Sequence, residues 1–300
     1  MSSPAKTSNA LLQATLITAA AAVIVLSVYF FRKSEKLSFV DFNPPGSNNV
    51  QFCDPTRPRV ITVENKVPRI LLSDLQVKNN PNSVLVHVEF HVLSATRKPV
   101  TDTDLSSKNT AHFQLIAASP SLDDIQLLEP HYNAKEGSWS FEFSPQAEGN
   151  YSLFADLIPE ATQAEIYTSA HVTLPKLTPS RLKPTAQTDT IKAELIKPSP
   201  KLYAGQAYEL SIQLTDKNNK PILVIPQLGS FAHLIVIDTS QTAFINAKVD
   251  PLHIDHTIDL HTPTFFFNLL VPDPGKYVLC TAVNISGKLN YFTFPLTIEP

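Results

Sequence analysis

Histidines are the residues of this chain best suited to metal chemistry, and the densest group lies near the C-terminus. His253, His256 and His261 alternate there with Asp255 and Asp259. Neutral imidazole nitrogens and carboxylate oxygens are ligands that Zn and Cu accept. The spacing suits a loop wrapped around an ion, but it matches no defined motif. An exposed polar loop explains the same residues, and both interpretations stay open.

A second group lies within one apolar-polar alternation. His87, Glu89 and His91 occupy every second position, so on a strand they share one face at a spacing of about 7 Å. One strand rarely supplies a complete coordination sphere, and we therefore favour a solvated polar face.

Two further histidines, His112 and His233, each follow an alanine at the start of an apolar run. The residue types recur because the surrounding pattern recurs, and shared architecture is a sufficient reason for that. For both positions we expect a structural histidine at the edge of a sheet.

Catalytic and nucleotide-binding motifs give no support for an enzyme. The chain has no G-x-S-x-G, H-E-x-x-H, G-x-G-x-x-G or G-x-x-x-x-G-K motif. Cys280 ends an apolar run as a blue-copper cysteine does, but no histidine follows it, and the single methionine is Met1. With a net charge of −3 and a pI near 6.3, the chain also lacks a basic stripe for nucleic acid.

The strongest pattern is a motif series that occurs twice, roughly 125 residues apart. Each copy contains an Ala-His pair, an alternating aromatic triplet and a Gly-x-Tyr sequence, in that order. The triplet that begins at Trp139 precedes Tyr151 by the same distance as the triplet at Phe265 precedes Tyr277. A duplicated unit predicts two domains of one fold.

The elements that would position these residues are β-strands, because the dominant period is two. Val86, Val88 and Phe90 alternate with polar residues, and each copy contains about seven such segments. We expect an all-β chain of two tandem immunoglobulin-like antiparallel β-sandwiches, with Gly-x-Tyr as a tyrosine corner. The predicted domains are residues 67–174 and 190–300, separated by a proline-rich linker over residues 175–189.

The N-terminal region predicts a membrane anchor. After a tail over residues 1–9, residues 10–31 are predominantly apolar and uncharged, and as a helix they would extend about 33 Å. Arg32 and Lys33 follow at once. A cleaved signal peptide is the alternative, but the run is long and no small-x-small site follows it before the charges. A proline-rich spacer over residues 32–66 would connect this single-pass transmembrane helix to the sandwiches.

The sequence gives two opposing indications of orientation. The positive-inside rule, applied to Arg32, Lys33 and Lys36, favours a cytoplasmic C-terminal part, whereas the fold type favours an extracytoplasmic one, periplasmic or at the cell surface. We expect the extracytoplasmic orientation. Cys53 and Cys280 are expected to be unrelated thiols rather than a disulfide.

The repeat resembles bacterial cell-envelope proteins with tandem immunoglobulin-like domains. In that group a His-Leu-(Ile/Val)-Val strand precedes a His-x-His-Pro turn, an aromatic strand and a Gly-x-Tyr-x-Leu-Phe strand. The sequences from His233 to Val236 and from Gly149 to Phe154 are similar to the first and last elements. The resemblance implies an extracytoplasmic location. The His-x-His-Pro turn is absent from both copies, so the resemblance weakens a metal role and leaves only His112 and His131 as a remnant of the site.

These observations predict a non-enzymatic, membrane-anchored envelope protein that acts as an interaction or scaffold module, or as an accessory subunit of a membrane complex. It would bind a protein partner near the membrane, and neither nucleic acid nor nucleotide. The alternative is a Cu or Zn binding or delivery protein, with the candidate ligands His112, His131, His253, His256 and His261. A hydrolase or carbohydrate-binding domain ranks third, because Trp139 lies on a core-facing pattern.

Overall fold

The computed structural model describes residues 36–42, 61–62, 71–79, 85–106, 112–174, 190–248 and 260–300. The chain divides into two compact units, Met1–Ser38 and Phe39–Pro300, and both sandwiches belong to the second unit. The predicted anchor, residues 10–31, lies outside the described residues. Within the described ranges, no helix is both long and apolar enough to cross a membrane.

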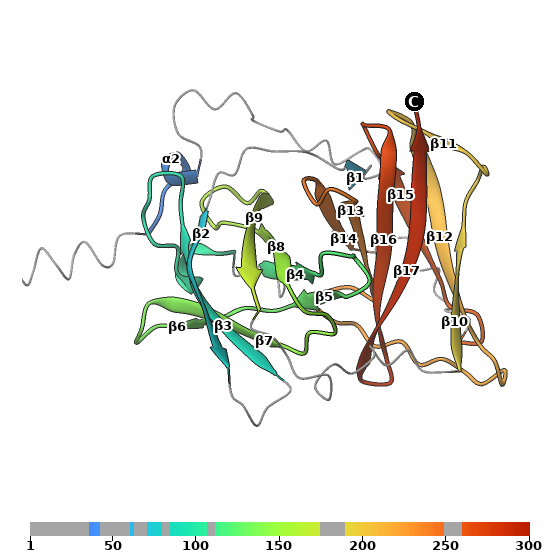
Figure 1. Ribbon diagram of the computed structural model, residues 1–300, viewed down its shortest axis with the longest axis horizontal. Coiled ribbons are helices and arrows are strands. Elements are labelled where there is room, and N and C mark those ends of the chain that lie inside the picture. The colour runs from blue at the N-terminus through green and yellow to red at the C-terminus, as the bar shows by residue number, and fades with distance from the viewer. Residues whose placement is uncertain are drawn as a thin grey trace, which may run out of the picture. The chain divides into compact units, whose positions relative to one another are not determined.

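The first sandwich consists of two antiparallel sheets (Figure 1). Its strands are β2 (Leu71–Asn79), β3 (Val86–Leu93), β4 (Phe113–Ala118), β5 (Ile125–Leu128), β6 (His131–Asn133), β7 (Ser138–Phe143), β8 (Asn150–Leu157) and β9 (Ile166–Thr173), with a 3-10 turn η1 (Asp102–Asp104) before β4. One sheet has the order β2-β3-β7-β6 and the other β5-β4-β8-β9. In chain order this is the ABED and C′CFG arrangement of immunoglobulin domains.

The second sandwich repeats this plan. Its strands are β10 (Ile191–Ile196), β11 (Leu202–Tyr203), β12 (Ala207–Asp216), β13 (Ala232–Asp238), β14 (Phe244–Lys248), β15 (Thr264–Leu270), β16 (Gly275–Ile285) and β17 (Lys288–Glu299). One sheet contains β15-β12-β10 and the other has the order β11-β17-β16-β13-β14. The prediction of two immunoglobulin-like sandwiches is therefore confirmed.

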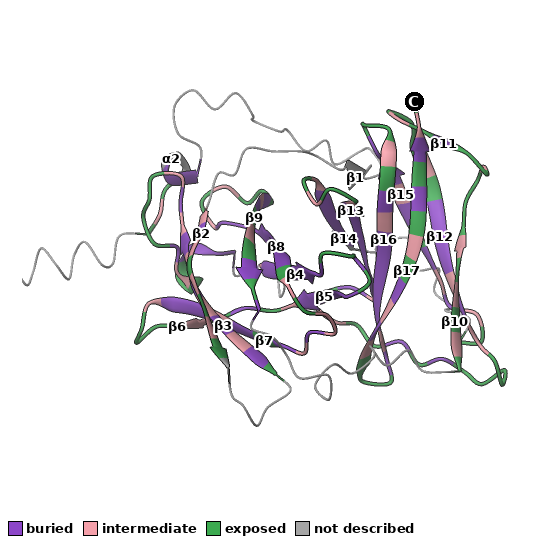
Figure 2. Cartoon of the chain, in the orientation of Figure 1, coloured by how far each residue is buried: buried purple, intermediate pink, exposed green. Residues whose placement is uncertain are grey.

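Each core forms where the apolar faces of two sheets meet, as the buried residues in Figure 2 show. In β3, alternate residues are buried, as the period of two predicts. Trp139 is 1% exposed, and its indole N–H donates to the Val100 carbonyl at 2.9 Å. The side chain is thus part of the core and is not available to bind a sugar.

Both tyrosine corners are present. The Tyr151 hydroxyl lies 3.3 Å from the Ala147 carbonyl, and the Tyr277 hydroxyl donates to the Asp273 carbonyl at 2.9 Å. Gly149, at φ 114°, begins the first corner with a backbone conformation that residues with a Cβ rarely adopt. The repeated glycine and tyrosine therefore have the structural role that the sequence predicts.

The segment expected to be a spacer contributes structure to both sandwiches. A short helix, α2 (Phe39–Phe42), lies against the turn after β3: the Thr96 hydroxyl donates to Asp41 Oδ1 at 2.6 Å, and Lys98 Nζ lies 3.0 Å from the same oxygen. Further along, β1 (Ile61–Thr62) pairs in parallel with β15. Parts of this segment are thus integrated into the second unit.

Candidate functional site: the interface between the sandwiches

Strands β4 and β13 are buried on both faces, whereas a sheet of a β-sandwich usually has one face in the core and the other in solvent. All six residues of β4 are buried, and so are the first six of β13. In β13, Leu234 and Val236 belong to the core of the second sandwich, whereas Ile235 and Ile237 belong to a separate apolar cluster. A second surface must therefore cover the outer face of this sheet.

That surface is the corresponding sheet of the first sandwich. We call the residues of the shared apolar cluster the inter-sandwich cluster. Its buried members are Ile116, Ala118, Leu122, Ile125, Leu127, Phe154, Ile235, Ile237, Phe244, Cys280 and Ala282. Each large apolar side chain buried in this way contributes about 1.5–3 kcal/mol. The two sandwiches are consequently one packed body.

The interface contains the same pair of contacts twice, because the last strand of each sandwich meets the C′ strand of the other. Tyr167 of β9 packs edge-on against Phe244 of β14, with ring centroids 5.4 Å apart. In the reciprocal position, Tyr291 of β17 contacts Leu127 of β5: its hydroxyl lies 3.0 Å from the Leu127 nitrogen. The ladders give Tyr167 and Tyr291 equivalent positions, opposite Asp156 and Ala282. This reciprocity is the property of a two-fold, isologous contact.

Size complementarity completes the apolar contact. Phe154 and Cys280 occupy equivalent positions, three residues after each corner tyrosine. The Phe154 ring lies 4.6 Å from the Phe244 ring, centroid to centroid, whereas Cys280 is small and fully buried. The two copies thus contribute a large and a small side chain from equivalent positions to one close-packed cluster.

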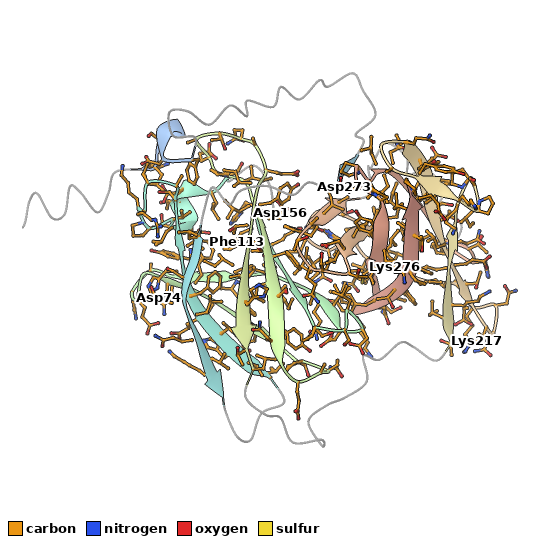
Figure 3. The ribbon with its side chains drawn as sticks, turned by 45° about the horizontal axis from the view of Figure 1, so that its top comes forward. Asp74, Phe113, Asp156, Lys217, Asp273 and Lys276 are labelled. Atoms are coloured by element: carbon orange, nitrogen blue, oxygen red, sulfur yellow. The ribbon has the colours of Figure 1, made fainter. Side chains whose placement is uncertain are left out.

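Polar contacts fix the register of the interface. The Gln241 amide donates to the carbonyls of Ser119 and Pro120, at 2.9 and 3.1 Å. The Asn246 amide donates to Gln114 and, at 3.3 Å, to Asp156, a buried carboxylate labelled in Figure 3. Buried polar groups cost free energy when unpaired, so these bonds favour one arrangement of the sheets over sliding ones.

Two ionisable groups of the interface, the Cys280 thiol and the Tyr291 phenol, stay in their neutral forms at neutral pH. Burial raises the pKa of Cys280 to about 12, and the nearby charge of Asp124 adds to this effect. Burial also raises the pKa of Tyr291, partly offset by the hydrogen bond with the Leu127 backbone. A thiol that stays protonated at neutral pH is a poor nucleophile. Cys280 is therefore a packing residue. Cys53 lies outside the described residues, and the separation of the two thiols stays a prediction.

Of the predicted metal ligands, the structure describes His112, His131 and His261. His112 precedes β4, and its Nε2 lies 3.3 Å from Asp102 Oδ1. Tyr132 faces the core, with its ring 5.1 Å from that of Trp139, so strand alternation directs its neighbour His131 to the opposite, outer face. His261 is exposed, and His253 and His256 lie outside the described residues.

Across the described part of the chain, no group of three or more His, Cys, Asp or Glu side chains is placed to hold a metal ion. Binding of Cu or Zn by the loop with His253, His256 and His261 stays a prediction. His233 is buried, and its Nε2 lies 3.0 Å from the Gln227 carbonyl, as expected for a structural histidine.

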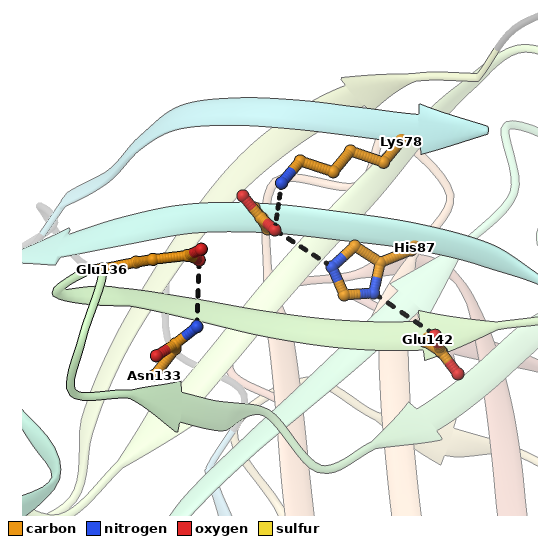
Figure 4. A network of polar contacts seen from close by, with 6 residues as sticks. Lys78, His87, Asn133, Glu136 and Glu142 are labelled. Carbon is orange, nitrogen blue, oxygen red and sulfur yellow. Dashed lines mark hydrogen bonds and ion pairs between the residues drawn. The ribbon is translucent and has the colours of Figure 1, made fainter. Parts of the chain in front are cut away.

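The polar face of β3 contains an ion-pair network instead (Figure 4). Lys78 contacts Glu89, and the two ring nitrogens of His87 lie 3.4 Å from Glu89 and 3.4 Å from Glu142. The hydrogen bond with Lys78 holds the pKa of Glu89 below its usual value. Because both imidazole nitrogens already face carboxylates, this arrangement favours the polar-face interpretation of His87, Glu89 and His91.

The comparisons give a partial family match. A model of a domain of unknown function, DUF8832, matches residues 186–300, which is the second sandwich with the end of the preceding linker. No curated protein matches the chain.

Solved structures with β-sandwich modules are similar to the chain at a distance. The fibronectin(III)-like modules of Clostridium thermocellum CbhA are 10% identical, with 71% of this chain and 85% of that one covered and a TM-score of 0.21. The chicken interferon gamma receptor alpha chain is 9% identical, with 76% and 98% covered and a TM-score of 0.22. At these scores the assignment of the fold depends on the strand order described above.

Proposed function

We propose that this protein is a non-enzymatic, membrane-anchored envelope protein that serves as an interaction module or an accessory subunit of a membrane complex. Residues 10–31 would anchor it, and the sandwiches would lie on the extracytoplasmic side. The partner would be a protein at the membrane, bound through the surface of the two-sandwich body.

The observation that carries this proposal is the inter-sandwich cluster. Two domains joined only by the proline-containing linker, residues 175–189, would move independently and hold a partner in no fixed position. A buried apolar contact with reciprocal tyrosines, at Tyr167 and Tyr291, instead joins the domains into one body. A body of fixed shape loses less conformational entropy when it binds, which favours a scaffold role.

The experiment is a co-purification of the full chain from membranes of its own cells. Ile237→Asp places a charge among the apolar side chains of the inter-sandwich cluster, and Lys201→Asp, on an exposed site, is the matched control. We expect a stable partner to co-purify with the wild type and with Lys201→Asp, and to be lost with Ile237→Asp. Recovery of the wild type as a monomer without any stable partner would contradict the proposal.

A further inference from the structure

The two halves of the interface between the sandwiches differ in polarity. Because the contact is two-fold, each residue in one half has an equivalent residue in the other half. In one half, β14 and the loop before it lie against β4 and β8 of the first sandwich. In the other half, β5 and the loop before it lie against β13 and β16 of the second sandwich.

The loop residues Leu122 and Gln241 are equivalent. Each has a positive φ, 60° and 59° respectively, and the backbone N–H of each donates to the carbonyl three residues earlier. Their side chains differ: Gln241 accepts a hydrogen bond from the Ser152 hydroxyl, whereas Leu122 is a buried member of the inter-sandwich cluster. Ser152 and Val278 are also equivalent, one residue after each corner tyrosine, and Val278 packs against that cluster. A polar pair in one half thus corresponds to two apolar residues in the other.

The strand residues change type in the same way. Asn246 Nδ2 donates to Gln114 Oε1 and, at 3.3 Å, to Asp156 Oδ2. Counted from the two Ala-His pairs, Ile235 is the equivalent of Gln114. Counted from the corner tyrosines, Ala282 is the equivalent of Asp156, and both equivalents are buried in the inter-sandwich cluster. We call one half the polar half, formed by Gln114, Ser152, Asp156, Gln241 and Asn246, and the other the apolar half, formed by Leu122, Ile235, Val278 and Ala282.

A pair of two second sandwiches would mismatch these residues. By the same two-fold geometry, Asn246 would lie opposite Ile235 and Ala282. Gln241 would lie opposite Val278. Both amides would then be buried without hydrogen-bond partners, which costs the desolvation free energy of each polar group. A two-fold pair contains every such mismatch twice.

A pair of two first sandwiches is disfavoured as well. Leu122 would lie opposite the Ser152 hydroxyl instead of an apolar side chain. In the strand ladders, Glu129 follows β5 at the position that Asn246 has in β14. The Glu129 carboxylate would therefore approach Asp156, and like charges brought together at an interface repel.

We propose that the polar half makes the interface selective, so that the face of each sandwich binds the face of the other sandwich and rejects a second copy of itself. Only the unlike pair sets polar groups against polar groups and apolar groups against apolar groups. Concentrated copies of the chain thus stay single bodies instead of joining through like faces. This selectivity goes beyond the proposed interaction function, since it concerns contacts between the sandwiches themselves.

The first test is a double-mutant cycle in the full chain with Cys53→Ser. Ser152→Val and Gln241→Leu each set an apolar side chain against a polar one, whereas the two together reproduce the residue types of the apolar half. The alkylation rate of Cys280, which is fully buried, reports opening of the interface. We expect each single variant to react about tenfold faster than the parent chain, and the double variant to react within about threefold of it. Effects of the two substitutions that simply multiply would overturn the proposal.

The second test measures the oligomeric state of the purified full chain in detergent by light scattering. Gln241→Leu with Asn246→Leu removes the mismatches from a pair of two second sandwiches. Gln206→Leu with Asn218→Leu makes the same substitutions at exposed positions and is the matched control. We expect the wild type and the control to stay monomeric, and the interface variant to dimerise with a Kd lower by about tenfold or more.

Two results of the second test would contradict the rejection of like faces: an interface variant as monomeric as the wild type, or a wild type that dimerises as strongly as the variant. Circular dichroism checks that each variant keeps its strands, and if the interface variant does not fold, the double-mutant cycle decides alone. Both readouts are independent of whether a partner co-purifies from membranes.

Discussion

The two sandwiches share a core plan and differ in how each corner tyrosine is held. In the first sandwich the Tyr151 hydroxyl donates to the buried carboxylate of Asp124 at 2.6 Å, and the same carboxylate accepts bonds from the Gln146 nitrogen and the Gln126 amide. In the second sandwich, Tyr277 donates to a backbone carbonyl, that of Asp273. Asp124 makes the first corner a charge-assisted network, and the second corner is a single neutral bond.

The two sheet faces that meet at the interface carry different side chains at equivalent positions. Phe154 and Cys280 occupy equivalent positions of the two sandwiches, and so do Tyr167 and Tyr291. The members of each pair contact different residues of the other sandwich. After a duplication, core positions are constrained by one fold, whereas positions on the shared face must fit each other. The interface therefore joins two equivalent surfaces whose side chains differ, as in a two-fold dimer of two related but non-identical subunits.

The largest expected effect comes from the interface. Phe154→Ala should lower the free energy of unfolding by about 3–5 kcal/mol, because it leaves a cavity beside Phe244. A double-mutant cycle with Phe244→Ala should give a coupling of about 0.5–1.5 kcal/mol. Urea unfolding followed by circular dichroism, and by the fluorescence of Trp139, the single tryptophan, measures both.

The control for this prediction is Phe266→Ala. Its ring is 40% exposed, so the change should cost about 1–2 kcal/mol, less than Phe154→Ala. Additive effects of Phe154→Ala and Phe244→Ala would mean that the two rings do not stabilise each other.

Cys280 reports opening of the same interface. In a Cys53→Ser background, alkylation at pH 8 should be about a thousandfold slower than for a free thiol, because burial raises the pKa of Cys280 to about 12. Phe154→Ala should accelerate it, as measured by mass spectrometry over time. Fast alkylation of the wild type would show that the sandwiches separate readily.

The two tyrosine corners should differ in their sensitivity to loss of the hydroxyl. Tyr151→Phe is expected to cost about 1.5–3 kcal/mol, since it removes a donor from the Asp124 carboxylate. Tyr277→Phe should cost about 0.5–1.5 kcal/mol, since its acceptor is a neutral carbonyl. Thermal unfolding of both variants measures the difference, and equal costs would rule out a special role for Asp124.

The reciprocal tyrosines of the interface allow a finer test. Tyr291→Phe should cost about 0.5–1.5 kcal/mol, because its hydroxyl contacts the Leu127 backbone in a partly buried position. Tyr167→Phe should change stability by less than about 0.5 kcal/mol, because its hydroxyl donates to Glu165 at an exposed site. Chemical unfolding distinguishes the two, and the opposite ranking would contradict the hydrogen-bond assignment.

The smallest effect concerns the polar face of β3. Lys78→Met should raise the pKa of Glu89 toward its usual value, since the hydrogen bond with Lys78 is the main cause of the lowered pKa. A carboxyl whose pKa is lower in the folded state than in the unfolded state stabilises the fold at pH values above its unfolded-state pKa. This stabilisation is lost as the pH falls through its folded-state pKa. The variant should therefore lose less stability on acidification. NMR titration of the Glu89 carboxyl in both proteins measures the shift; identical titrations would contradict it.

The sequence was sufficient for the strands and the repeat, because burial of one face imposes a period of two. It also predicted the tyrosine corners, from the Gly-x-Tyr pairs at Tyr151 and Tyr277. It did not predict the interface, although a signal was present: from Leu234 to Ile237 the apolar residues are continuous rather than alternating, a pattern typical of strands buried on both faces. For β1 the signal was a short apolar stretch, Val60 to Val63, too brief to distinguish a strand from a spacer.

For the metal candidates, the strands set the directions of the side chains. His112 directly precedes β4 and His131 lies on β6, strands of different sheets, and strand alternation directs His131 outward. His253 and His256 lie outside the described residues, and their part in metal binding stays a prediction.

By itself, the sequence determined the local plan of each sandwich: which segments are strands, which face of each strand is apolar, and where the glycine and tyrosine of each corner lie. These are properties of short windows, because the period of side chains and the conformations allowed to glycine act over a few residues. The tertiary structure alone decided that the two C′CFG sheets meet, that Phe154 lies against Phe244, and that residues 61–62 pair with β15. Those contacts join residues far apart in the chain, and they depend on the shapes of two complete faces rather than on any local pattern.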